Sequence, residues 1–432
     1  MEDLFKGTAD KYEKEAIDLL SELIAIPCYK GVKNDSIINY LNDKLLTLDC
    51  NPEVFEADSN KFYDLAEHCP DVIGAEKTQK YISGMIKGSG GGKSLLIYSH
   101  LDTMDIIDPN SWFTNPLKLV NKDRKLYGLG AADAKSAVAV CVMSMSILKK
   151  MGIKLKGDVK FIAENEKDYG ATGPLEVFTK GCNCDSALYI HSPETGNPLG
   201  ETKIRAHGMF TFRITVFGET TELTEPGYNP ISYKNIKNGT NAINKSIKVL
   251  QALYEYADKR DKLYNTSDDH EKTIFNIGLI KGGSAPGLIP ESCVIEGNIM
   301  FDTNETVNSI YDDVNSIIHK LVKGDNDFTK KPPKLELFGK KSNPANIYSL
   351  GKGTEIIDTI KRALNIENGC EYTTLSKHPG SAIRFPMIFD NTPTIGFGPL
   401  AGNFSKPNEW VSLDEYMKCI KVVVNMIYDW CK

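Results

Sequence analysis

Two short segments carry residues suited to metal chemistry. His100 and Asp102 follow the apolar stretch SLLIYSH and lie two residues apart, on the same side of an extended segment. An aspartate in that place orients an imidazole and makes it a better ligand. Asp133 lies between a glycine-rich turn and a helix of small residues in YGLGAADAKSAVAV. Each pattern alone is weak, because H-x-D pairs are common and an aspartate before a helix is usually an N-cap, but their order along the chain is more informative.

The order of these motifs resembles the superfamily of zinc-dependent aminoacylases, acetylornithine deacetylases and succinyl-diaminopimelate desuccinylases, over nearly the whole chain. The ending GFGPLAGNFSKPNEWVSLDEY is similar to the final metal segment of that superfamily, in which a His precedes x-P-N-E. The resemblance implies that His100 is a ligand at the first metal position, that Asp102 supports it and that Asp133 bridges two metals. It implies zinc, one or two ions, with cobalt or manganese as alternatives. Bound metal would activate a shared water, and a nearby glutamate would take the proton.

The stretch FIAENEKDYGATG departs from the superfamily pattern D-E-E-x-G-S-x-G, whose first glutamate is the base and whose second is a ligand. Alignment on the flanking Phe-Ile and Gly-x-x-Gly places Lys167 at the base and Asp168 at the ligand. An ammonium group has no lone pair to accept a proton. Glu166, turned inward by a one-residue bulge, is therefore the first choice for the base, and Glu164 is the alternative.

Ligand positions depart from the pattern as well. Ser405 replaces the expected histidine of the second metal position, and Ala382 replaces a common aspartate. Where many members carry an acid before the lid, YIHSPETG offers His191 or Glu194, and His191 fits the strand end better. A histidine satisfied without metal is an alternative of nearly equal weight.

Counting donors predicts one viable metal position. The first position would collect His100, Asp133 and His191, which is a three-ligand catalytic set with room for water. The second would have only Asp133 and Asp168, with Ser405 as a weak third ligand.

Two residues are candidates for substrate binding by the same resemblance. Arg384 in GSAIRF matches an arginine that holds a substrate carboxylate, and a surface ion pair is the alternative. Asn241 in GTNAIN resembles a lid residue that reaches the substrate, although an asparagine beside a helix start is more often a cap.

The pattern of elements predicts an α/β fold with a mixed sheet, of the zinc-aminopeptidase type, and an inserted lid. Strands alternate with helices up to about residue 202, for example a helix over 9–26 and strands at DVKFIAE and SALYIHS. From about residue 203 the order is strand, helix, two strands, helix, strand, which predicts a two-layer α+β module of ferredoxin-like type. We therefore expect a catalytic domain over 1–202 and 340–432, and a lid and dimerisation domain over 203–339.

Composition limits the partners and the compartment. The 432 residues carry a net charge of −6 and no dense run of Lys and Arg, so nucleic acid is not expected as a partner. No run of about 18 apolar residues occurs, so we expect no membrane association and a cytoplasmic protein. Ten scattered cysteines are interpreted as reduced, mostly buried thiols, and the pair Cys182 and Cys184 has no partner pair at zinc-finger spacing.

These observations favour a metal-dependent hydrolase that cleaves an amide bond of a small N-acylated amino acid or a dipeptide-like compound. The alternative is a catalytically inactive relative that binds a ligand or partner through the same cleft, because Lys167, Ser405 and Ala382 each replace a group used by the two-metal mechanism. A third hypothesis is that Lys167 performs different chemistry on a related substrate. A homodimer through the lid domain is expected from the resemblance.

Overall fold

The structure is a computed structural model of the whole chain. The residues that it describes are 10–29, 31–62, 65, 78–106, 108–165, 171–193, 199, 201–219, 240–264, 273–302, 304–352, 354–368, 374–379 and 381–432. The chain forms two compact units. Unit 1 comprises Met1–Ala206 and Ala345–Lys432, and unit 2 comprises His207–Pro344.

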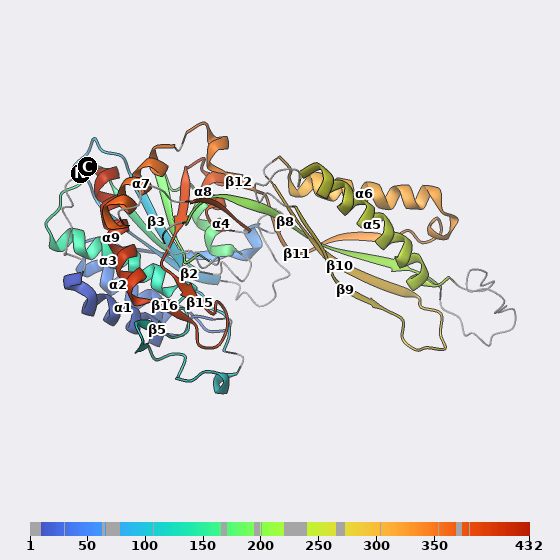
Figure 1. Cartoon of the computed structure of the whole chain (residues 1–432), viewed down its shortest axis with the longest axis horizontal. Helices are drawn as coiled ribbons and strands as arrows, with labels where there is room; N and C mark the ends of the chain where they lie inside the picture. The colour runs from blue at the N-terminus through green and yellow to red at the C-terminus, as the bar shows by residue number, and fades with distance from the viewer. Residues whose placement is uncertain are drawn as a thin grey trace. The chain divides into compact units, whose positions relative to one another are not determined.

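Unit 1 is built on a mixed sheet with helices packed against it (Figure 1). Its helices are α1 (Glu13–Ala25), α2 (Asp35–Thr47), α3 (Lys135–Lys150), α4 (Thr172–Phe178), α7 (Thr354–Asn368), α8 (Arg384–Phe389) and α9 (Leu413–Cys431). Its large sheet contains β1 (Glu53–Asp58), β2 (Thr78–Ile86), β3 (Leu95–His100), β6 (Val159–Glu164), β7 (Ser186–Ile190), β14 (Thr394–Phe397) and the start of β8 (Glu201–Phe217), with β12 (Ala345–Asn346) and β13 (Thr374–Pro379) paired to β8. A small sheet contains β4 (Val120–Lys122), β5 (Lys125–Tyr127), β15 (Ala401–Gly402) and β16 (Trp410–Ser412). The predicted mixed α/β class is confirmed.

The central strands of the large sheet follow the order β6-β3-β7-β14 and run parallel to one another. All six residues of β3 are buried, as expected for an apolar strand that is covered on both faces. Helix α3 packs against β3, α1 and α9, and 14 of its 16 residues are buried, because its small side chains allow these neighbours to approach closely. The parallel strands therefore end together at one edge of the sheet, which is where α/β proteins place their sites.

Helix ends in unit 1 follow local signals in the sequence. Helix α1 ends at Ala25, two residues before Pro27, because a proline inside a helix removes a hydrogen bond and clashes with the preceding turn. Helix α9 begins after Ser412, whose side chain accepts a hydrogen bond from the backbone N–H of Glu415. The predicted helix over 9–26 is thus found slightly shorter, after a 3-10 turn over Asp10–Tyr12.

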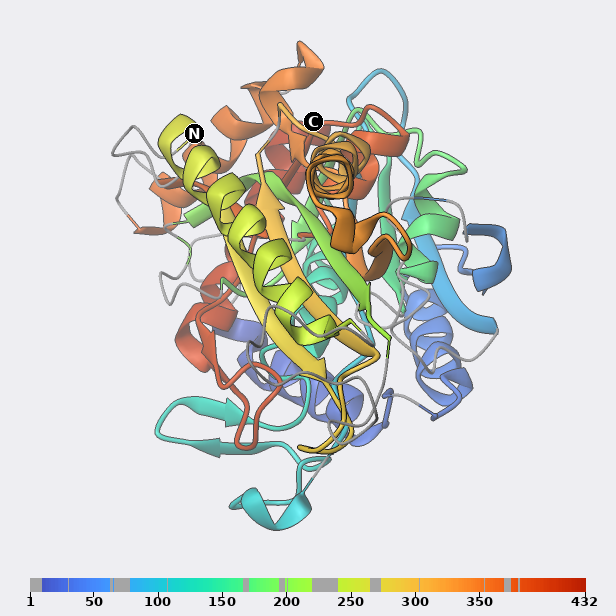
Figure 2. The same cartoon turned by 90° about the vertical axis from the view of Figure 1, so that its right-hand side faces the viewer.

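Unit 2 is a four-stranded antiparallel sheet with both of its described helices on one face (Figure 2). Its elements are the remainder of β8, α5 (Ala242–Tyr264), β9 (Ile274–Gly282), β10 (Ser292–Phe301), α6 (Val307–Gly324) and β11 (Lys334–Ser342). The strand order β11-β8-β10-β9 and the element order are those of a ferredoxin-like βαββαβ module. Helix α6 begins with a capping box formed by Thr306 and Ser309.

Strand β8 explains why a domain boundary is hard to place from sequence. It runs without a break from Glu201 to Phe217 and belongs to both units, pairing with β14 and β12 at its start and with β10 and β11 further on. The expected boundary at residue 203 therefore lies inside a continuous strand. Among the described helices, none combines the length and apolarity needed to cross a membrane.

Candidate metal centre

Neighbouring parallel strands bring two histidines together. His100 is the last residue of β3, and His191 follows the last residue of β7. Tyr98 pairs with Tyr189 across these strands, so the residues two positions further along point to the same face. Gly398 permits the end of β14 to lie against this place, because a Cβ there would come within 2.4 Å of the backbone of His191. The sheet register thus places both imidazoles side by side.

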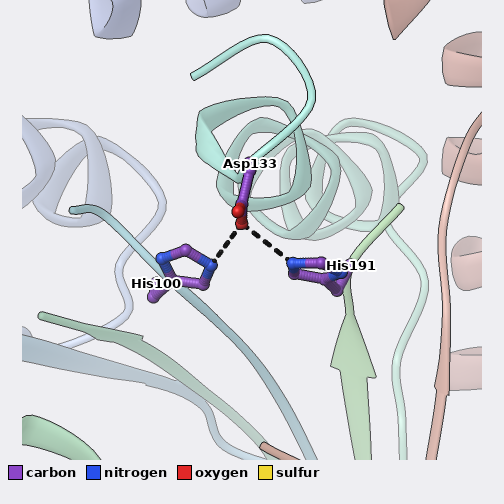
Figure 3. Close-up of side chains that lie close together, drawn as sticks. All are labelled: His100, Asp133 and His191. Atoms are coloured by element: carbon purple, nitrogen blue, oxygen red, sulfur yellow. Dashed lines mark hydrogen bonds and ion pairs between the residues drawn. The ribbon is translucent and has the colours of Figure 1, made fainter. Parts of the chain in front are cut away.

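Asp133 lies between the two rings (Figure 3). Its Oδ1 is 2.9 Å from Nε2 of His100 and 2.9 Å from Nε2 of His191. The two rings are stacked with centroids 5.7 Å apart, and both histidines are almost completely buried. Asp133 lies two residues before α3, whose N-cap is Ala134 without a side-chain cap bond, so the alternative of Asp133 as an N-cap is wrong. Three separate segments supply the three side chains.

In each ring Nδ1 points away from Asp133, and the hydrogen bonds of Nδ1 influence whether Nε2 can bind a metal. Nδ1 of His100 lies 3.2 Å from the carbonyl oxygen of Asp102 and 3.3 Å from its Oδ1, and Nδ1 of His191 lies 2.9 Å from the carbonyl oxygen of Ser192. These oxygens are acceptors, which favours a hydrogen on Nδ1 of His100. Nδ1 of His191 also lies 3.5 Å from Nζ of Lys203, which can only donate, so the tautomer of His191 depends on which of its two neighbours it uses. In both rings Nε2 is the nitrogen that faces Asp133.

This arrangement fits a divalent metal ion. Two imidazole nitrogens converge on one carboxylate oxygen, each at 2.9 Å, so three potential ligand atoms face a common point. Ligand atoms about 2.0–2.2 Å from a tetrahedral zinc ion are themselves roughly 3.4 Å apart, and the ligand atoms of the trio all lie within 4.8 Å of one another, so small shifts suffice to hold an ion. Within the described part of the chain, this trio is the one group of three or more such side chains close enough to share an ion.

Further contacts around the histidines were not predicted from the sequence. Lys203 on β8 is buried, and its Nζ lies 3.5 Å from Nδ1 of His191. The ring of Phe404 lies nearly parallel to that of His191, with centroids 6.5 Å apart. Both are distant in sequence from the trio, and their residue types are ordinary for a strand and a loop, so no local motif marks them.

Two buried ionisable side chains, Glu409 and Lys135, lie behind Asp133. The carboxylate of Glu409 accepts hydrogen bonds from the backbone N–H groups of Gly130, Ala132 and Asp133. Burial raises the pKa of Glu409 to about 8, although these three donors act in the opposite direction. Burial also lowers the pKa of Lys135 to about 8, and its Nζ donates to the carbonyl oxygen of Ile26 at 2.6 Å.

Several predicted residues lie outside the described part of the chain. These are Glu166, Lys167, Asp168 and Glu194. The roles of Glu166 as base and of Asp168 as ligand therefore stay predictions. Glu164, the alternative base, is the last residue of β6, pairs in register with His100 and is fully buried.

The two replacement residues have different surroundings. Ser405 is exposed and has a φ of 56°, so its backbone adopts the left-handed conformation. Ala382 is fully buried, and its carbonyl oxygen accepts a hydrogen bond from the hydroxyl of Tyr98 at 3.1 Å. Neither position supplies a strong metal ligand in this chain.

The two candidate substrate residues are engaged by their own segments. Arg384 is only 8% exposed and donates from Nη1 to the carbonyl oxygen of Ser381 at 3.0 Å, so the alternative of a surface ion pair is wrong. Asn241 accepts a hydrogen bond from the backbone N–H of Asn244 at 3.1 Å, which is the capping role considered for it. Their contacts with a substrate stay predictions.

Comparison with known proteins assigns the family. The model of "Peptidase family M20/M25/M40" matches residues 96–429, which is most of the chain and includes all three members of the trio. The chain belongs to peptidase family M20/M25/M40. Members of this M20 family are metal-dependent amidohydrolases or peptidases, and the chain is accordingly a metal-dependent hydrolase.

The M20 relatives are distant but similar over their full length. An N-formyl-4-amino-5-aminomethyl-2-methylpyrimidine deformylase of Halalkalibacterium halodurans is 22% identical, over 98% of this chain and 96% of the relative. An acetylornithine deacetylase of Buchnera aphidicola is 24% identical, over 94% of this chain and 98% of the relative. Both are named as enzymes that remove an acyl group.

Solved structures of similar proteins support the M20 fold. A tripeptidase from Staphylococcus aureus has a TM-score of 0.71 at 19% identity, covering 97% of this chain and 98% of its own. A Bacillus subtilis protein described as a dinuclear metal-binding peptidase of family M20 has a TM-score of 0.59 at 12% identity, covering 98% of this chain and 99% of its own. At these identities the likeness concerns the fold alone.

Replacing Asp102 by asparagine tests the support of His100. The amide removes the negative charge 3.3 Å from Nδ1 of His100 and turns one of its oxygens into a donor. We expect the affinity for Zn²⁺ to fall about 10- to 100-fold, because such outer partners fix the ring and raise its basicity. Competition with a chromogenic chelator measures the affinity. Asp105→Asn, an exposed site three residues further on, is the matched control, and equal affinities for the two variants would refute the role.

Proposed function

We propose that this M20 protein is a deacylase that hydrolyses the amide bond of a small N-acylated amino acid or of a dipeptide-like compound. The convergence of His100, Asp133 and His191 carries the proposal, because it supplies three protein ligands and leaves coordination positions for water and substrate. The name of the acetylornithine deacetylase relative supports an N-acylated amino acid as substrate, and the name of the deformylase relative supports removal of an acyl group.

Zinc is the proposed metal, with cobalt or manganese as alternatives. Imidazole and carboxylate ligands suit all three ions. When bound, such an ion lowers the pKa of a water ligand toward neutrality and polarises an amide carbonyl. One functional position is proposed, because Ser405, which replaces the histidine of the second position, is exposed and neutral.

The chain itself supplies orientation, charge and proton transfer. The carbonyl oxygens of Asp102 and Ser192 lie against Nδ1 of the two rings, and both rings present Nε2 to the centre. Asp133 adds the negative charge between them. Glu166 is the proposed group that takes the proton from water and later gives it to the leaving amine, and Glu164 is its alternative.

Arg384 and Asn241 are the proposed substrate contacts. A guanidinium suits the terminal carboxylate of an N-acyl amino acid, because it can donate two parallel hydrogen bonds. The amide nitrogen of Asn241 remains suited to a substrate oxygen while its Oδ1 caps α5.

A panel of N-acyl amino acids tests the function. Acetyl, formyl and succinyl derivatives and several dipeptides are incubated with the protein and with Zn²⁺, Co²⁺ or Mn²⁺, and released amine is measured. We expect turnover of at least one class by the wild type and loss of turnover in the presence of a chelator. If the wild type stays inert with every metal although it binds Zn²⁺, the protein is an inactive relative that binds ligands through this site.

A homodimer through unit 2 is also proposed. Strand β9 forms the outer edge of the sheet in the described chain, and its side chains Leu279 and Ile280 are 43% and 54% exposed. These two consecutive residues point to opposite faces of the sheet, and Ile280, opposite the buried Ile295, is on the face that α5 covers. Ile247 and Tyr254 of α5 are exposed as well, and the ring of Tyr254 lies 6.0 Å from that of Phe275 on β9. An exposed apolar edge strand is a surface to which a second strand can pair.

Replacing Ile280 by glutamate tests this dimer. Burying an unpaired carboxylate at the interface is costly, so we expect a protein that is dimeric at micromolar concentration to become monomeric. Light scattering coupled to size exclusion measures the mass. Leu46→Glu, an equally exposed apolar site on unit 1, is the control and is expected to stay dimeric. A wild type that is already monomeric would contradict the proposal.

We also propose a cytoplasmic location. The described cysteines are free thiols, and seven of these eight are buried, as is usual in a reducing compartment.

A further inference from the structure

We propose that Glu409 is a positioning residue, which holds the backbone of residues 130–133 so that Asp133 faces the two histidines. The inference rests on the metal site of the proposed function. The C-terminal segment that contains Glu409 would then contribute to the metal site without supplying a ligand to the ion.

Glu409 binds this turn at four points. Its Oε1 accepts from the N–H groups of Ala132 and Asp133, at 2.7 and 2.8 Å. Its Oε2 accepts from the N–H of Gly130 at 3.0 Å, and its main-chain oxygen accepts from the N–H of Gly128 at 3.0 Å. With 1% of its surface exposed, the side chain makes these contacts away from bulk water.

The small sheet delivers Glu409 to this place. Strand β16 begins one residue later and pairs antiparallel with β5, with Trp410 opposite Tyr127. Glu409 therefore stands opposite Gly128, where the chain leaves β5 and enters the turn. Pairing of two short strands thus fixes the carboxylate against a segment about 280 residues earlier in the chain.

The turn needs such a partner. Gly130 has a φ of 84°, a conformation that glycine adopts readily, and a Cβ there would collide with Lys135 and Thr103 at 2.9 Å. Buried backbone N–H groups without an acceptor cost roughly 1–3 kcal/mol each. One carboxyl group satisfies several of them at once, because its two oxygens accept from three N–H groups.

The position of the turn decides the position of Asp133. The N–H that donates to Glu409 belongs to Asp133 itself, and its carboxylate lies 2.9 Å from Nε2 of both histidines. On the other side, Lys135 is anchored to the carbonyl oxygen of Ile26. Metal sites tolerate misplacement of a ligand by only a fraction of an ångström, so a loosened turn weakens the site.

Glu409 is not proposed as a metal ligand. Both of its carboxylate oxygens are already bonded to backbone N–H groups at 2.7–3.0 Å. The same segment carries the exposed Ser405 where the resemblance expects a histidine ligand. Glu409 therefore acts on the metal site through its hydrogen bonds to the backbone of residues 130–133.

Glu409→Gln tests the inference with little change in shape. The amide keeps one acceptor oxygen but places an NH₂ donor against a backbone N–H. We expect the dissociation constant for Co²⁺, followed by the visible absorption of the bound ion, to rise about 10- to 100-fold. Glu176→Gln is the matched control, because Glu176 on α4 is a glutamate of unit 1 that is 2% exposed and pairs with Lys180, which follows that helix. His100→Ala is the second comparison.

The outcomes separate the inference from the proposed function. Weak binding by Glu409→Gln with normal binding by Glu176→Gln supports the positioning role. Equal affinity in wild type and Glu409→Gln, while His100→Ala loses Co²⁺, overturns the positioning role and leaves the metal site standing. If His100→Ala binds Co²⁺ as well as the wild type, or the wild type binds none, the metal site itself is wrong.

Hydrogen exchange of the metal-free wild type gives a second measurement in case Glu409→Gln does not fold. We expect the amides of Gly130, Ala132 and Asp133 to exchange slowly, because each donates to a buried carboxylate. Exchange of these amides at the rate of an unstructured peptide would overturn the inference without any variant.

Discussion

Asp133→Asn is expected to be the most damaging single substitution in the protein. Asp133 is the one member of the trio that lies 2.9 Å from both others, and it supplies the negative charge among them. Asparagine keeps the shape but brings no charge and can turn its NH₂ toward the lone pairs. We expect kcat/KM on the best substrate of the panel to fall roughly a thousandfold, about 4 kcal/mol of transition-state stabilisation.

The control for this prediction is Asp35→Asn. Asp35 is the first residue of α2, so it is also an acid at a helix start, but it is paired with Lys80 rather than with histidines. Its replacement is expected to leave kcat/KM within about twofold of the wild type, since exposed ion pairs contribute little. Similar activity of the two variants would mean that Asp133 takes no part in the reaction.

Removing either histidine is expected to cost nearly as much as removing both. His100 and His191 lie within reach of one ion, so His100→Ala and His191→Ala each leave only two protein ligands. We expect each to weaken Zn²⁺ binding by about a hundredfold or more, and the double variant to lose far less than the product of the two effects. A cycle of four proteins titrated with Zn²⁺ measures this coupling. His319→Ala, an exposed histidine on α6, is the control.

The same cycle of four proteins also tests the alternative that His191 is satisfied by its own hydrogen bonds and binds no metal. If the two effects multiply, the histidines act independently, and His191 is a strand-end residue that its hydrogen bond to Ser192 satisfies without metal. Strong coupling instead requires a shared partner, because their direct ring contact at 5.7 Å contributes little by comparison.

The sequence predicted those site residues that lie at the end of a recognisable strand or close to the start of a recognisable helix. H-x-D at the end of an apolar strand, and an aspartate before a helix of small residues, predicted positions that the structure brings within hydrogen-bonding distance. His191 could be chosen over Glu194 because it aligned with the strand end. The period of the strands and their parallel order then place the two imidazoles together.

Other features depend on contacts that no local pattern records. The role of Glu409 depends on which backbone amides a carboxylate reaches across about 280 residues of chain, and the P-N-E motif alone does not reveal it. The burial of Arg384 depends on packing of a short helix, so the surface ion pair was a wrong alternative. The expected domain boundary fell inside β8 because one strand serves both units.

Anomalous diffraction from crystals grown with Zn²⁺ shows whether His100, Asp133 and His191 bind a metal ion together. We expect a peak at the zinc absorption edge, about 2.0–2.2 Å from Nε2 of His100, from Nε2 of His191 and from the carboxylate of Asp133. Saturating Zn²⁺ with no peak among these three side chains, or a peak bound elsewhere while they remain in hydrogen-bonding contact, would contradict it.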